Sequence, residues 1–241
     1  MSGRVGSITT DIIADGLIFN MDAANRASCI PSSNTTIAYN TVDLSESGSF
    51  INDTMYDSST ISPSFVLDGV GDYIAISPSA TIAGKAAVSI SVWIKPAQVA
   101  ASNERIYDET TSTSGYTRIG LEQDADNIQM KWRDSAADPS GGAGTLTTTD
   151  VLSTGVWVHI VGVWDSNNNE QKIYINGTSN VSSTTSISAF GTSTTHGINI
   201  GRGSDASNYF QGNITNVQIY NLALSSTEVL HNYNALKHRF T

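Results

Sequence analysis

The stretch Gly197–Lys237 constrains the fold of this chain more than any other. Its apolar residues recur at every second position in two runs, which indicates two strands. The alternation slips by one residue near Thr215–Asn216, which predicts a β-bulge. Ser225 and Glu228 have the spacing of a capping box, in which a hydroxyl and a carboxylate satisfy the first free amides of a helix. Apolar residues follow at helical spacing: Val229, Leu230, Tyr233 and Leu236.

The rest of the chain reads as short strands separated by turns. From about residue 64 onward, apolar runs alternate with clusters of Gly, Ser, Thr, Asn and Asp. No internal repeat is visible over 241 residues, a length that all-β sandwiches commonly use as one domain. We therefore predict one domain over 16–241, preceded by an N-terminal arm over 1–15. Residues 23–62 hold few apolar anchors and predict a long irregular loop, of the kind that is usually functional or covered by a partner.

Four segments carry a resemblance to a known family. Phe210–Val229 reads F-x-G-x-I-x-x-V-x-I-Y-N-x-A-L-S-x-x-E-V, and Leu67–Ile74 contains D-G-x-x-D-Y-I. Val88–Lys95 contains an aliphatic-S-x-W-x-K strand, and Trp157–Gly177 combines W-x-H with Y-x-N-G. Together they resemble the laminin G-like, concanavalin A-like jelly-roll family. The resemblance implies an all-β fold: a two-sheet antiparallel jelly-roll sandwich with a short C-terminal helix.

Two terminal segments carry a narrower resemblance. Gly16–Asn25 and Asn234–Phe240 are similar to segments of jelly-roll proteins in tailed phage particles. That resemblance implies a non-enzymatic virion structural protein, either a capsid decoration or a fibre-like component, assembled in the host cytoplasm. Its partners would be other virion proteins and further copies of this chain, held by the arm and by the 23–62 loop. Exposed rim loops would meet glycans on the host surface.

Composition excludes several other classes of protein. The formal net charge is −10 and the chain has only 12 Lys and Arg residues, which argues against binding to a phosphate backbone. No apolar run is long enough to span a bilayer, and no apolar leader follows Met1. Cys29 is the single cysteine, so no disulfide can form within the chain. We expect no nucleic-acid partner and no membrane partner.

Glu122–Asp126 is the strongest hint of an enzyme. Jelly-roll glycanases carry a similar series of acids on one strand, where alternate residues face the same side and two carboxylates can flank a glycosidic bond. Here the acids at Asp124–Asn127 separate two alternating apolar runs, a position typical of a hairpin turn. We therefore predict no catalytic residues, and we keep a glycan hydrolase as the least favoured alternative.

A metal site is a second alternative. Laminin G-like relatives often carry calcium on the rim of the sandwich, and calcium prefers oxygen ligands. The candidate ligands are Asp108, Asp205 and Asn208, which also read simply as polar turn and strand-end residues. No cofactor is expected, with calcium kept as an alternative. His159 alternates with Val158 and Ile160 and reads as a packed or hydrogen-bonded strand residue.

Aromatic residues at strand ends predict a glycan-binding patch, because sugar faces stack on aromatic rings while polar groups bind the hydroxyls. Trp93, Trp157 and Trp164 lie within apolar strands and are expected in the core, as is Trp132. The predicted rim patch consists of Tyr107, Asp108, Arg133, Asp205, Asn208 and Tyr209. This patch can form only if the strand ends and loops that carry these residues lie close together in the fold. A free calcium-dependent carbohydrate-binding lectin module is the alternative to the virion reading.

Overall fold

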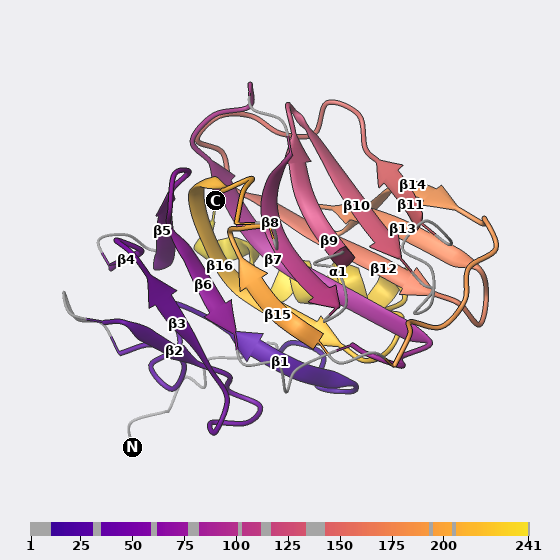
Figure 1. Cartoon of the computed structure of the whole chain (residues 1–241), viewed down its shortest axis with the longest axis horizontal. Helices are drawn as coiled ribbons and strands as arrows, with labels where there is room; N and C mark the ends of the chain where they lie inside the picture. The colour runs from indigo at the N-terminus through magenta and orange to yellow at the C-terminus, as the bar shows by residue number, and fades with distance from the viewer. Residues whose placement is uncertain are drawn as a thin grey trace, which may run out of the picture.

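The chain folds as two antiparallel sheets packed face to face, with one helix at its C-terminal end (Figure 1). The computed structural model describes residues 11–30, 35–58, 62–76, 82–100, 103–111, 117–133, 143–192, 195–203 and 206–240. Figure 1 shows the strands of one sheet in front and those of the other behind, with the helix α1 behind both. This is the predicted jelly-roll sandwich.

Sheet A, the rear sheet in Figure 1, has eight strands among the described residues. Their order is β14 (Thr178–Ser183), β13 (Glu170–Ile175), β12 (Val158–Asp165), β7 (Ala87–Pro96), β16 (Gln211–Tyr220), β5 (Ser64–Asp68) and β4 (Met55–Asp57), and β1 (Leu17–Met21) also pairs with β16. The central strands β7 and β12 are buried along nearly their whole length, because the core covers one face and the C-terminal segment covers the other.

Sheet B, the front sheet, also has eight strands within the described ranges. Their order is β11 (Ala143–Thr147), β10 (Asn127–Arg133), β9 (Thr117–Asp124), β8 (Glu104–Thr111), β15 (Thr195–Ile200), β6 (Tyr73–Ile76), β3 (Ser47–Ile51) and β2 (Ile37–Tyr39). On β10 the side chains alternate between buried and half-buried, so one face of this sheet packs on the core and the other faces outward.

The helix α1 (Ser226–Leu236) covers the outer face of sheet A. It begins with the predicted capping box, since Ser225 accepts a hydrogen bond from the Glu228 amide and the Glu228 side chain accepts one from the Ser225 amide. Val229, Asn232 and Ala235 are its buried residues. Val229 joins a second apolar cluster between the helix and the sheet, whose other members are Val161, Val163, Tyr174, Tyr220 and Leu224. The short helix η2 (Lys237–Arg239) follows directly.

The end of the chain completes this cover with aromatic rings. Phe240 stacks on Trp93 with centroids 4.0 Å apart, and Tyr233 stacks on the same indole at 5.7 Å. Trp93 and Trp164 are buried as predicted, and so is Trp132. Trp157, expected in the core, is instead half-buried at the surface, where its ring contacts Phe240 at 5.0 Å. Trp157 directly precedes Val158, the first residue of β12, so it is not part of the sheet.

The predicted bulge is present in β16. Its register with β7 shifts between Thr215 and Gln218, and Asn216 adopts a left-handed φ of 48°. Asparagine tolerates this conformation better than most residues. The bulge therefore occurs where the alternation of the sequence slips.

The expectation of a long irregular loop at 23–62 is wrong. Within that span the structure has β2, β3 and β4, which extend sheet B and sheet A at the same end of the sandwich. Two of these strands are only three residues long, so they contain too little alternation to be recognised in sequence.

The described part of the N-terminal arm packs on its own chain. The Ile13 amide donates to Asn232 Oδ1 at 2.8 Å, and the Tyr220 hydroxyl donates to the Ile13 carbonyl at 3.2 Å. Residues 1–10 of the predicted arm lie outside the described residues. No helix in the described part of the chain is both long and apolar enough to cross a bilayer.

Candidate functional site

The two outer faces of the sandwich differ in what covers them. The outer face of sheet A lies under α1 and the C-terminal aromatic rings. Sheet B carries no helix among the described residues, so its outer face is the larger surface left for a ligand.

Strand register aligns one residue from every strand of sheet B in a row across this outer face. From edge to edge the row is Ile37, Ser49, Ala75, Asn199, Asp108, Gly120, Lys131 and Thr145. The two residues at the middle of the row, Asn199 and Asp108, are polar. The residues on either side of them, Ala75 and Gly120, are small, so their side chains fill little of the space over the sheet.

A charged cluster on β8, β9 and β10 includes Asp108 and Lys131 of this row and two residues beside it, Arg105 and Glu122. Glu122 is fully buried and forms ion pairs with both Arg105 and Lys131. Arg105 Nε also lies 3.4 Å from Asp108 Oδ2, which accepts a hydrogen bond from Thr117 at 3.0 Å. Because each carboxylate has a cation beside it, the cluster compensates its own charge and stiffens this part of the face.

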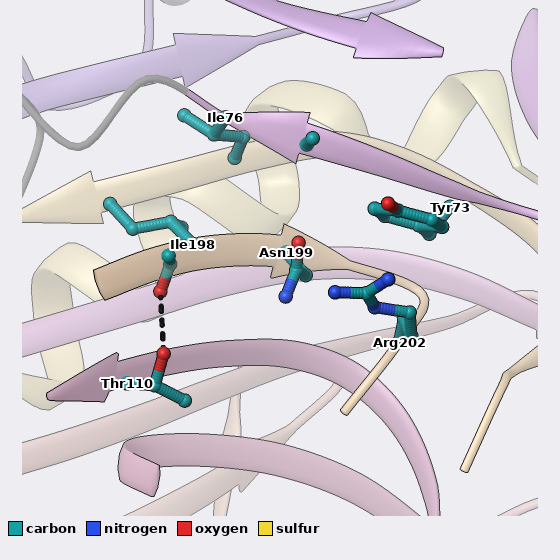
Figure 2. Close-up of a pocket in the computed structure, with 8 residues that line it drawn as sticks. Tyr73, Ile76, Thr110, Ile198, Asn199 and Arg202 are labelled. Atoms are coloured by element: carbon teal, nitrogen blue, oxygen red, sulfur yellow. Dashed lines mark hydrogen bonds between the residues drawn. The ribbon is translucent and has the colours of Figure 1, made fainter. Parts of the chain in front are cut away.

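A pocket of about 260 Å³ lies beside this cluster, at β6, β15 and β8 (Figure 2). Figure 2 shows Asn199 and Arg202 next to each other, with Tyr73 above them on β6 and Thr110 below on β8. The remaining lining comes from Ala75, Ile76, Gly197 and Ile198. The Thr110 hydroxyl donates to the Gly197 carbonyl at 3.2 Å, which leaves its oxygen as an acceptor.

Aromatic and cationic groups meet at one end of the pocket. The guanidinium carbon of Arg202 lies 3.9 Å from the centroid of the Tyr73 ring, a close cation–π contact. The ring of Tyr209 lies 6.5 Å from that of Tyr73, at an angle of 55°. All three side chains are half-buried, so they are held by packing and still reach solvent.

The structure brings part of the predicted rim patch to this site. The Asn208 carbonyl accepts from the Arg105 amide at 2.8 Å, and Tyr209 contacts Tyr73, so the loop after β15 does approach the start of β8. Asp108 faces outward beside Asn199. Asp205 lies outside the described residues.

The other two members of the patch lie elsewhere. Tyr107 is fully buried and points into the core, where its hydroxyl donates to Glu109 at 3.4 Å, so it presents no ring to a ligand. The bulge between Arg105 and Tyr107 turns Tyr107 inward. Arg133 ends β10, two strands away from β8.

Calcium does not fit Asp108 as the structure places it. Its Oδ2 already accepts from Thr117 and lies beside the Arg105 guanidinium, a cation that a metal ion would have to displace. No group of three His, Cys, Asp and Glu side chains suited to a metal ion occurs in the described part of the chain.

The pocket depends on three residues that the sequence prediction passed over: Tyr73, Asn199 and Arg202. A signal for Asn199 existed, because it is the polar residue between Ile198 and Ile200 and so faces away from the core. No local pattern indicates that it meets Tyr73 and Arg202, since β6 and β15 are far apart in the chain.

Comparison with known proteins places this fold in a family. A laminin G model described as concanavalin A-like lectin/glucanases superfamily matches residues 68–230. No curated protein sequence matches the chain.

Solved structures share the fold at low identity. Domain 4 of a GH43 extracellular arabinanase from Geobacillus stearothermophilus, in complex with arabinotriose, matches with a TM-score of 0.60 and 18% identity, over 90% of this chain and 98% of that one. A botulinum neurotoxin serotype D ligand-binding domain in complex with N-acetylneuraminic acid matches with a TM-score of 0.65 and 17% identity, over 91% of this chain and 51% of that one. Trypanosoma rangeli sialidase in complex with the inhibitor DANA matches with a TM-score of 0.69 and 14% identity, over 95% of this chain and 34% of that one. The chain thus spans about half of that toxin domain and a third of the sialidase.

Proposed function

Because this chain belongs to the concanavalin A-like lectin/glucanases superfamily, we propose that it is a non-catalytic glycan-binding module whose site is the outer face of sheet B. The observation that carries the proposal is the pocket between Tyr73, Asn199 and Arg202 on the face that no described helix covers. The residues that line this pocket are of the types that bind sugars.

A sugar needs directional polar contacts and an apolar surface for its C–H groups. The amide of Asn199 and the hydroxyl of Thr110 supply the first, and the ring of Tyr73 with that of Tyr209 beside it supplies the second. The pocket volume of about 260 Å³ lies below the usual range for drug-sized ligands, which suits one sugar ring at a chain end or branch.

The structural neighbours support the class of ligand. Two of them are described as complexes with arabinotriose and with N-acetylneuraminic acid. At 18% and 17% identity these matches establish only the shared fold, so the choice of glycan rests on this chain's own pocket.

We propose a binding role rather than hydrolysis because of how Glu122 is held. Arg105 engages its Oε2 and Lys131 its Oε1, so neither oxygen is free to protonate a leaving group. Glu122→Gln should therefore leave glycan binding intact, and the protein should release no reducing sugar from glycans that it binds. Release of reducing sugar that disappears in Glu122→Gln would contradict the non-catalytic role.

Equilibrium binding to a panel of glycans tests the proposed function. Ala75→Phe fills the pocket from β6 and should weaken binding at least tenfold. Thr145→Phe places the same ring on the exposed part of the same face, on β11, and should leave affinity unchanged. Loss of binding in Thr145→Phe but not in Ala75→Phe would place the glycan site at β11 and not at the pocket. Absence of binding to every glycan would contradict the proposed function.

The setting that we propose for this module is a tailed-phage virion, with other virion proteins and further copies of the chain as partners. The support is the resemblance of Gly16–Asn25 and Asn234–Phe240, which the structure joins through an ion pair between Asp22 and Arg239. Many copies on one particle would multiply weak glycan contacts by avidity. Mass spectrometry of purified particles tests this setting, and a chain found only free would favour the lectin-module alternative.

A further inference from the structure

A neutral sugar would leave the only cation of the described pocket lining, the guanidinium of Arg202, without an anionic partner. This group lies over the ring of Tyr73, with its carbon 3.9 Å from the centroid. A guanidinium carries its N–H donors in a planar fork, and the contact with a ring pairs none of them with an acceptor oxygen. That fork matches the two oxygens of a carboxylate.

Arg202 differs from other arginines of the chain in its partners. Arg105, Arg118 and Arg239 each form an ion pair with a carboxylate of the same chain. Arg202 forms no such pair with any described residue, and its buried Nε donates no hydrogen bond to one. Its charge is thus held in place by Tyr73 and is not neutralised within the described structure.

Asn199 supplies a second polar group at the same place. The residue is 6% exposed, and its side chain makes no hydrogen bond to another described residue. Figure 2 shows it beside Arg202 in the pocket. A side-chain amide offers one acceptor and two donors, which can bind a sugar hydroxyl while Arg202 binds an acid group.

We propose that the pocket binds a sugar that carries a carboxylate, of the uronic or sialic acid type. This inference rests on the proposed glycan-binding function and names its ligand class. Arg202 holds the carboxylate, Asn199 a hydroxyl, and Tyr73 fixes the guanidinium.

The charge of the whole chain makes the contact with Arg202 the source of any selectivity for an acidic sugar. The chain has a formal net charge of −10, so its long-range field repels anions rather than recruiting them. Selectivity for an acid must therefore come from the short-range contact with Arg202. Because that side chain is half-buried, salt should screen its contact with the acid less than it screens a pair on the open surface.

Matched sugars test the inference on the full chain. The first pair is methyl glucuronide against methyl glucoside, and the second is the methyl glycoside of N-acetylneuraminic acid against its methyl ester. In at least one pair the acid should bind at least tenfold more tightly, as measured by isothermal titration calorimetry. Equal affinity within both pairs would overturn the inference. A glucoside 6-sulfate that binds as tightly as the best acid would show a general anion site and would also overturn it.

Variants separate this inference from the proposed function. Arg202→Gln should remove the preference for the acid and leave the neutral sugar unchanged, whereas Arg133→Gln removes the same charge from β10 and should retain the preference. If neutral sugars bind with the same affinity as acids and Ala75→Phe still abolishes binding, the glycan site stands and the acid specificity is wrong. If no sugar of either kind binds, both proposals fail.

Discussion

Arg239 and Asp22, 217 residues apart in the chain, form a two-point ion pair in which Nη1 and Nη2 each donate to one carboxylate oxygen at 2.8 Å. The side chains are only 13% and 12% exposed. Asp22 directly follows β1 and Arg239 ends η2, so this pair joins the two ends of the domain on sheet A. Bidentate geometry with little exposure makes such a pair stronger than an ordinary surface pair.

A double-mutant cycle of Asp22→Asn and Arg239→Gln should give a coupling free energy on the order of 1–2 kcal/mol in urea unfolding. The pair Glu170 and Lys172, at 2.8 Å but with 38% and 29% of each side chain exposed, is the control. Its coupling should be below about 0.5 kcal/mol because solvent screens exposed pairs. Equal coupling in the two cycles would contradict the role of the terminal pair.

Removal of the last aromatic ring should loosen the cover of sheet A. Phe240→Ala loses the 4.0 Å stack on Trp93 and should lower the free energy of unfolding by about 1.5–3 kcal/mol. Leu230→Ala, on the exposed side of α1, should cost less than about 0.5 kcal/mol. A Phe240→Ala variant as stable as the wild type would show that the ring does not pack in solution.

His159 predicts a pH dependence of stability. Its side chain is fully buried, its Nε2 lies 2.9 Å from Ser91 Oγ, and burial lowers its pKa from 6.5 to about 3. The unfolded chain therefore takes up a proton below pH 6.5 that the folded chain refuses, so stability falls as pH falls from about 6.5 toward 3.

The predicted loss from this histidine between pH 6.5 and about pH 5 is roughly 2 kcal/mol, at about 1.4 kcal/mol per pH unit. His159→Gln should lack that part of the slope, whatever its absolute stability. His238→Gln removes an exposed histidine and should keep the wild-type slope. Identical slopes for wild type and His159→Gln would mean that His159 is protonated in the fold.

The bulge in β16 predicts an unusual order of substitutions. Asn216 has a φ of 48°, which costs a β-branched residue about 1–2 kcal/mol more than glycine. Asn216→Val should therefore be less stable than Asn216→Gly in thermal unfolding. At Asn213, an ordinary position on the same strand, valine should be the more stable replacement, because glycine weakens a strand. The same order at both positions would contradict the bulge.

Local patterns in the sequence were sufficient where a feature depends on neighbouring residues. Ser225 with Glu228 predicted the helix start, and the slipped alternation at Thr215–Asn216 predicted the bulge. The hairpin turn after Asp124 is also present, with Ala125 in a left-handed conformation. Each of these depends on residues a few positions apart.

Features that depend on distant pairing or on a shift of parity could not be predicted. Tyr107 would face outward with Arg105 if β8 were regular, and the bulge between them reverses it. The row that places Asn199 between Ala75 and Asp108 exists only because β15 pairs with β6 and β8. The pocket was therefore visible only after the sheet order was known.

The central claim is that a glycan binds the outer face of sheet B at the pocket. Titration of ¹⁵N-labelled protein with the tightest-binding glycan, followed by amide chemical shifts, tests it most directly. The largest shifts should occur in β6, β15 and β8, with the Asn199 side-chain amide and the amide of Arg202 among them, and shifts in α1 should be small. Saturable shifts confined to α1 and the outer face of sheet A would contradict it.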